Sequence, residues 1–190
     1  MHFNLNNIPE IFFNSETGSP FTECKVCGET LTDGREYLIE KSFVHYNDKV
    51  NDDLVWEAAM CLNCVLELRK EYSEESYRRM NAYFESNMNF DRQRELAESQ
   101  NFTVSDWLDT CVITGKKRPE CGQYQIYGHF LGGSAVFDSG PFMLSGEAMD
   151  EAIQLMSNET LDNMNRFRDQ HFPPPEDLRP LFEDPKFVFI

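Results

Sequence analysis

Two kinds of hydrophobic pattern follow each other in the first half of the chain. Residues 37–44 (YLIEKSFV) are rich in β-branched and aromatic side chains and come after turn residues at positions 32–34, a combination that predicts a strand within a hairpin. After Cys64, apolar side chains recur every three or four positions among charged ones, which is typical of an amphipathic helix. The pattern therefore predicts a β-hairpin followed by a helix.

The second half repeats much of this pattern at a nearly constant distance. A shift of 87 positions places five residues on identical ones: Cys24, Gly28, Tyr37, Ile39 and Phe43 on Cys111, Gly115, Tyr124, Ile126 and Phe130. A shift of 84 positions does the same for Ser73, Glu75, Met80 and Asn81 on Ser157, Glu159, Met164 and Asn165. In both copies the serine can cap the N-terminus of a helix. Order and spacing therefore predict an internal duplication.

These patterns divide the chain into five parts. We expect an extended lead-in at residues 1–22, a first lobe at 23–90, a helical linker at 91–108, a second lobe at 109–172 and a proline-rich tail at 173–190. The last four residues (FVFI) are all apolar. Because exposing them to water would cost free energy, we expect them to dock on the body of the protein or on a partner subunit.

The composition adds one strong constraint, an excess of acidic residues. The chain of 190 residues has 33 Asp and Glu against 17 Lys and Arg, a formal net charge of -16. No Lys or Arg occurs between Pro119 and Asn165. Nucleic-acid binding depends largely on Lys and Arg that neutralise phosphates, so this charge argues against a nucleic-acid partner.

The beginning of the sequence carries no recognisable targeting segment. It lacks the basic and long apolar regions of a secretion signal, and no stretch of the chain approaches the roughly 20 apolar residues that a membrane span needs. We therefore expect a cytoplasmic protein that has reduced thiols and does not contact a membrane. In such a compartment, paired cysteines bind metal more often than they form disulfides.

The cysteine spacing is the strongest chemical signal. Two Cys-x-x-Cys pairs, Cys24 with Cys27 and Cys61 with Cys64, together supply the four thiolates of a tetrahedral Zn²⁺ site. Four protein ligands leave no open position for a water or substrate, so we expect one Zn²⁺ ion with a structural role.

The order of these features resembles the treble-clef zinc finger over residues 24–80: a cysteine knuckle, a hairpin, and a helix that begins with the second cysteine pair. A zinc ribbon, with both pairs on hairpin knuckles, is the alternative. The resemblance implies metal binding and names no substrate. The predicted fold class is α+β, with two tandem treble-clef-like lobes. The second lobe is expected to be metal-free, because Thr114 stands where the first lobe has Cys27.

We expect this chain to be a zinc-stabilised, acidic protein-interaction or adaptor module, as a single chain or as a homo-oligomer. An enzyme is the first alternative, with a weak candidate set of Cys121, His129 and Asp138 between the lobes, which has the residue types of a cysteine hydrolase. A nucleic-acid-binding finger is the second. A nuclease of the His-Asn-His type is disfavoured, because His45 would need a metal-binding histidine on the following helix and residues 46–128 contain none.

Overall fold

A computed structural model describes residues 4–45 and 52–172. The predicted tail at 173–190, its expected docking through the last four residues, and the loop residues 46–51 lie outside the described residues. Within the described ranges, no helix is long and apolar enough to cross a membrane.

A six-stranded sheet with antiparallel pairings forms the centre of the molecule. Its strands are β1 (Leu5–Asn7), β2 (Glu36–Val44), β3 (Asp53–Cys61), β4 (Gln123–Leu131), β5 (Ser134–Val136) and β6 (Phe142–Ser145). Their order is β1-β5-β4-β2-β3. The remaining strand, β6, pairs with β4 on the same edge as β5, nearer the start of β4. The predicted strand at 37–44 is confirmed as β2, and the mixed helix and sheet content confirms the α+β class.

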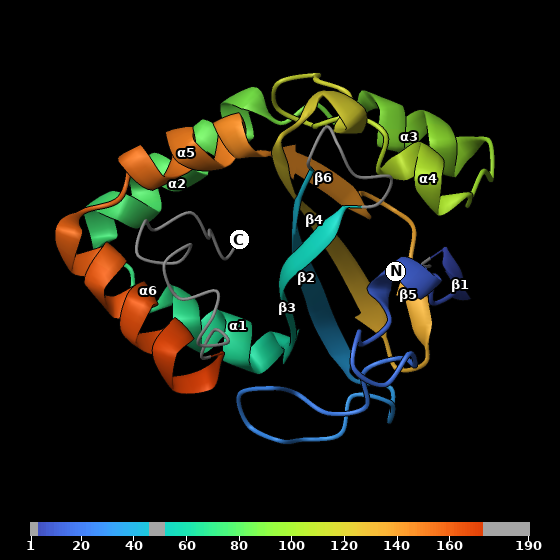
Figure 1. Cartoon of the computed structure of the whole chain (residues 1–190), viewed down its shortest axis with the longest axis horizontal. Coiled ribbons are helices and arrows are strands. Elements are labelled where there is room, and N and C mark those ends of the chain that lie inside the picture. Colours follow the sequence, from blue (N-terminus) through green and yellow to red (C-terminus); the bar gives the residue numbers. More distant parts are fainter. Residues whose placement is uncertain (1–3, 46–51, 173–190) are drawn as a thin grey trace.

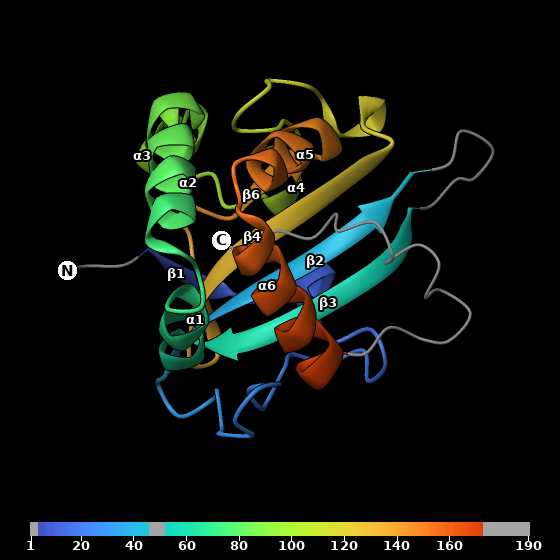
Figure 2. The same cartoon turned by 90° about the vertical axis from the view of Figure 1, so that its left-hand side faces the viewer.

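In the part of the chain that the structure describes, six α-helices accompany the sheet: α1 (Leu62–Arg69), α2 (Glu74–Asn87), α3 (Asp91–Glu98), α4 (Val104–Trp107), α5 (Gly146–Gln154) and α6 (Asn158–His171). Two short 3₁₀ helices cover Glu10–Phe12 and Arg118–Glu120. Figure 1 shows α1, α2, α5 and α6 on one side of the strands, and α3 and α4 near β6. Figure 2 shows α1 continuing directly from the end of β3.

Serine caps fix where the two longest helices begin. The side chains of Ser73 and Ser157 each accept a hydrogen bond from the backbone three residues later, as expected for an N-cap. The two caps also meet each other, since their Oγ atoms lie 3.1 Å apart. The hydroxyl of Thr160 joins them at 3.3 Å from Ser73. The helices α2 and α6 therefore approach each other at their N-termini.

The two halves of the chain share the sheet through a long pairing of β2 with β4. Glu40 lies opposite Tyr127, 87 positions later, and pairs of aromatic residues lie symmetrically on either side. Tyr37 stacks on Phe130 with ring centroids 5.2 Å apart, and Phe43 stacks on Tyr124 at 5.1 Å. Tyr37, Phe130 and Tyr124 are buried in the core, and Phe43 is partly buried against it.

Candidate metal centre

The four cysteines of the two predicted pairs lie together at the end of β3. The sulfur atoms of Cys24, Cys27, Cys61 and Cys64 all lie within 4.8 Å of one another. Cys61 ends β3 and Cys64 lies in the first turn of α1, whereas the first pair belongs to the loop before β2. The cluster could hold a metal ion.

A tight turn positions the first pair. The backbone N–H of Gly28 donates to the carbonyl oxygen of Cys24 at 2.9 Å. Gly28 has a φ of 70°, a left-handed conformation that costs glycine little. The N–H of Lys25 donates to the carbonyl of Ala59 at 2.9 Å, which attaches the turn to the edge of β3. The second pair is thereby brought beside the first.

The spacing of the sulfur atoms fits a four-thiolate site. The Sγ atoms of Cys27 and Cys61 are 3.8 Å apart. A tetrahedral ion with metal–sulfur bonds of about 2.3 Å places its ligand sulfurs roughly 3.8 Å from each other. The four side chains therefore need little rearrangement to bind an ion.

The pKa values of the cysteine thiols bear on whether a cation is needed at this site. Burial alone would raise the pKa of Cys24, but N–H groups of Cys27 and Cys61 hydrogen-bond its sulfur and lower that pKa below its usual value. Burial and neighbouring thiols raise the pKa of Cys27 and of Cys64. Four thiolates this close repel one another, so a bound cation is what would hold all four deprotonated.

The same turn recurs in the second half around Cys111. The N–H of Gly115 donates to the carbonyl of Cys111 at 3.0 Å, and Gly115 also has a φ of 70°. The sulfur of Cys111 accepts the N–H of Ser145 at 3.2 Å, as the sulfur of Cys24 accepts the N–H of Cys61 at 3.3 Å. Ser145 is therefore the structural counterpart of Cys61, at the position where the shift of 84 places it.

Hydroxyl groups stand where the first site has thiols. The Oγ1 of Thr114 and the Oγ of Ser145 are 3.2 Å apart, in the positions of Cys27 and Cys61. Ala148, the third residue of α5, corresponds in position to Cys64 in α1. The turn at Cys111 therefore has the backbone geometry of the turn at Cys24, but its surroundings offer one thiol where the first site has four.

The structure does not bring together the alternative catalytic set. Cys121 is buried just before β4, whereas His129 lies near the far end of that strand, and the strand segment from Gln123 to His129 alone extends roughly 20 Å. The Nε2 of His129 lies 3.2 Å from a carboxylate oxygen of Glu36. Asp138 accepts a hydrogen bond from the side chain of Asn4 at 3.1 Å.

Sequence reasoning missed a polar cluster at the other end of β2. The Nδ1 of His45 lies 2.7 Å from a carboxylate oxygen of Asp52, and the hydroxyl of Tyr124 donates to the other oxygen at 2.6 Å. Asp52 and Tyr124 are 72 positions apart. They meet because β2 pairs with β3, which follows Asp52, on one side and with β4 on the other. No spacing rule within one strand could have revealed the contact.

This cluster gives a prediction about pH. Partial burial of Asp52 opposes its charge, but hydrogen bonds from Tyr124 and His45 outweigh burial and lower the pKa of the carboxyl. A lowered folded-state pKa stabilises the protein above the unfolded value of about 3.9, and this stability is lost as pH falls through the folded value. We expect Asp52→Asn to cost about 1 kcal/mol of unfolding free energy at pH 7, and the difference from wild type to shrink below about pH 4. Urea denaturation at several pH values measures the unfolding free energy of both proteins. A difference between them that does not depend on pH would contradict this explanation.

Comparison with known proteins adds no relative to this picture: no protein-family model, no curated protein and no solved structure matches the chain.

Proposed function

We propose that Cys24, Cys27, Cys61 and Cys64 bind one structural Zn²⁺ ion, and that the chain is a protein-binding module stabilised by this ion. The observation that carries the proposal is the clustering of four cysteine sulfurs within 4.8 Å. A site made of four thiolates is typical of zinc or of iron–sulfur clusters, and two Cys-x-x-Cys knuckles on one closed site favour zinc.

The ion would connect three elements of the first half of the chain. It would link the turn at residues 24–28 to the end of β3 and to the first turn of α1. With all four positions filled by protein, the ion has no place for a reacting water, so its contribution is to folding. The second cysteine pair lies at the start of a helix, which supports a treble-clef-like arrangement over a zinc ribbon.

We infer that the second half is a copy of the first that has lost its metal. Matched hydrogen bonds at the two turns support this inference, as does the pairing of Glu40 with Tyr127, its own counterpart in the repeat. Both copies contribute a knuckle, a long strand and two helices, and the two sets share one sheet.

A protein partner suits the rest of the chain. The net charge of -16 disfavours nucleic acid and favours a basic partner surface. Reduced cysteines in a closed zinc site suit a reducing compartment such as the cytoplasm. The separation of Cys121 from His129 along β4 gives no support to a cysteine hydrolase.

Metal stoichiometry tests the first part of this proposal. Native mass spectrometry should find one zinc per chain, and chelation should reduce the helical and strand signals in circular dichroism. No metal, together with cysteines that are oxidised in pairs, would overturn the zinc assignment and favour redox chemistry.

The binding role needs a separate experiment. Affinity purification from the native cell should be run with zinc-loaded and with chelated protein, and each recovered partner should then be purified and titrated against both forms. A partner that forms a stoichiometric complex only with the zinc-loaded form supports a protein-binding module. Turnover of a small substrate by the purified chain, without a partner, would contradict it.

A further inference from the structure

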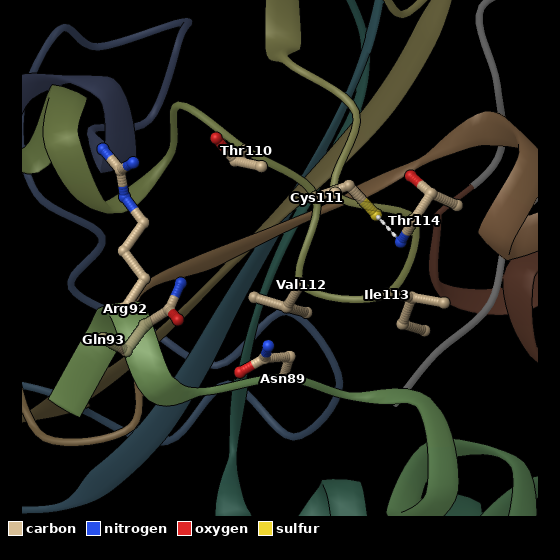
Figure 3. A pocket seen from close by; sticks show the side chains of 9 residues that line it. Asn89, Arg92, Gln93, Thr110, Cys111, Val112, Ile113 and Thr114 are labelled. Carbon is tan, nitrogen blue, oxygen red and sulfur yellow. Dashed lines mark hydrogen bonds between the residues drawn. The ribbon is translucent and has the colours of Figure 1, made fainter.

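Cys111 lines a pocket that the proposed zinc site does not use. The pocket has a volume of about 260 Å³ and lies between the turn at residues 110–115 and the start of α3. Figure 3 shows its lining, to which α3 contributes Arg92 and Gln93 and the preceding loop contributes Asn89. Although the protein is strongly acidic, no Asp or Glu among the described residues lines this pocket, and Asp109 lies 3.7 Å from its Arg92.

The surroundings of Cys111 favour a thiolate. Its sulfur accepts N–H groups from Ser145 at 3.2 Å and from Thr114 at 3.4 Å, the second of which is drawn in Figure 3. Burial opposes the charge, but these hydrogen bonds outweigh burial and lower the pKa of Cys111. Cys121 differs, because burial raises its pKa to about 11. Of these two thiols, Cys111 has the larger fraction of thiolate near neutral pH.

A second, independent feature of the pocket points to a ligand. Gln93 is 1% exposed, and its Oε1 atom has no hydrogen-bond partner within residues 4–45 and 52–172. Figure 3 shows its carboxamide extending from α3 toward the turn that carries Cys111. A buried carbonyl oxygen without a partner costs about 1–3 kcal/mol, and an amide N–H from a bound molecule would remove this cost.

We propose that this pocket binds a small, anionic disulfide that carries amide groups, and that Cys111 forms a mixed disulfide with it. Oxidised glutathione has this chemistry. The amide N–H would donate to Gln93. Arg92 at the rim of the pocket lies 3.7 Å from Asp109 and would turn part of its guanidinium to a ligand carboxylate.

The reaction is a thiol–disulfide exchange and needs no other oxidant. The thiolate sulfur of Cys111 attacks one sulfur of the small disulfide, so that a new S–S bond forms as the original S–S bond breaks. The other half leaves as a thiolate and takes a proton from water. Addition of a reduced thiol reverses the exchange and restores Cys111.

The test uses the zinc-loaded full chain with oxidised glutathione, and with cystamine as a cationic disulfide that has no amide. Peptide mass mapping over time should find the adduct on Cys111 at least about tenfold faster than on Cys121, and faster with glutathione than with cystamine. First reaction at Cys121, reaction at the cysteine cluster with zinc loss, or equal rates with both disulfides would overturn the proposal.

Gln93→Leu separates recognition from folding. The substitution removes a buried oxygen, Oε1, that has no hydrogen-bond partner among the described residues. The melting temperature should therefore stay the same or rise. The glutathione reaction should slow by about fivefold, the effect of one hydrogen bond, while the cystamine reaction stays unchanged. Equal slowing with both disulfides, or no slowing with either, would show that Gln93 does not bind the ligand. Because the readout is modification of Cys111 with zinc in place, its failure leaves the zinc proposal intact.

Discussion

Replacing Cys24 by serine is expected to release the metal ion and to unfold the first half of the chain. Structural zinc in a four-ligand site contributes about 10–16 kcal/mol of apparent binding free energy, comparable to the whole stability of a typical domain. Cys24 is 2% exposed and its sulfur accepts the N–H of Cys61, so loss of the thiolate also disturbs the contact between the turn and β3. We expect the same result for Cys64→Ser. Native mass spectrometry gives the metal content, and circular dichroism gives the folded fraction.

Cys111→Ser is the matched control. Cys111 is as buried as Cys24, and its sulfur makes the equivalent hydrogen bond to Ser145. If burial and hydrogen bonding decided the effect, both substitutions would cost about the same. If metal binding decides it, Cys111→Ser keeps the ion and costs only about 1–2 kcal/mol. Release of zinc by Cys111→Ser but not by Cys24→Ser would show that the ligand set is wrong.

Local features of this chain could be predicted from its sequence because neighbouring residues determine them. The strand at 37–44, the caps at Ser73 and Ser157, and the helix that became α3 all depend on residues a few positions apart. The cysteine cluster was also predictable, since a metal site demands that two distant pairs meet. Each of these features follows either from residues close together in the sequence or from the number of ligands that a metal ion needs.

What could not be predicted depends on pairing between distant strands. The sequence repeat suggested two lobes but did not indicate that β2 would lie between β3 and β4, an order that brings Tyr124 to Asp52. The pocket at Cys111 depends on packing between segments distant in sequence, since α3, in the expected linker, contributes Gln93 to its lining. The separation of Cys121 from His129 was equally invisible in the sequence, because only the structure shows that most of the eight positions between them belong to one extended strand.

The inferred duplication leads to a prediction of comparable size, the construction of a second metal site. The triple variant Thr114→Cys, Ser145→Cys and Ala148→Cys completes a four-cysteine set with Cys111. The backbone geometry is already present: the turn hydrogen bond of 3.0 Å at Gly115 matches that of 2.9 Å at Gly28. We expect native mass spectrometry to find two zinc ions per chain and the melting temperature to rise when zinc is added.

The third cysteine is the demanding one. Ala148 is completely buried, so a larger side chain there costs about 1–3 kcal/mol of packing energy, which a bound structural zinc would outweigh. Ala148→Cys alone should therefore destabilise the protein and bind no additional metal, whereas the triple variant should recover stability only with zinc. A folded triple variant that still holds one zinc would mean that α5 does not present residue 148 as α1 presents Cys64. In that case the two turns would share a local conformation without sharing the geometry of the metal site, and the duplication would have to rest on the sequence repeat and the β2–β4 pairing alone.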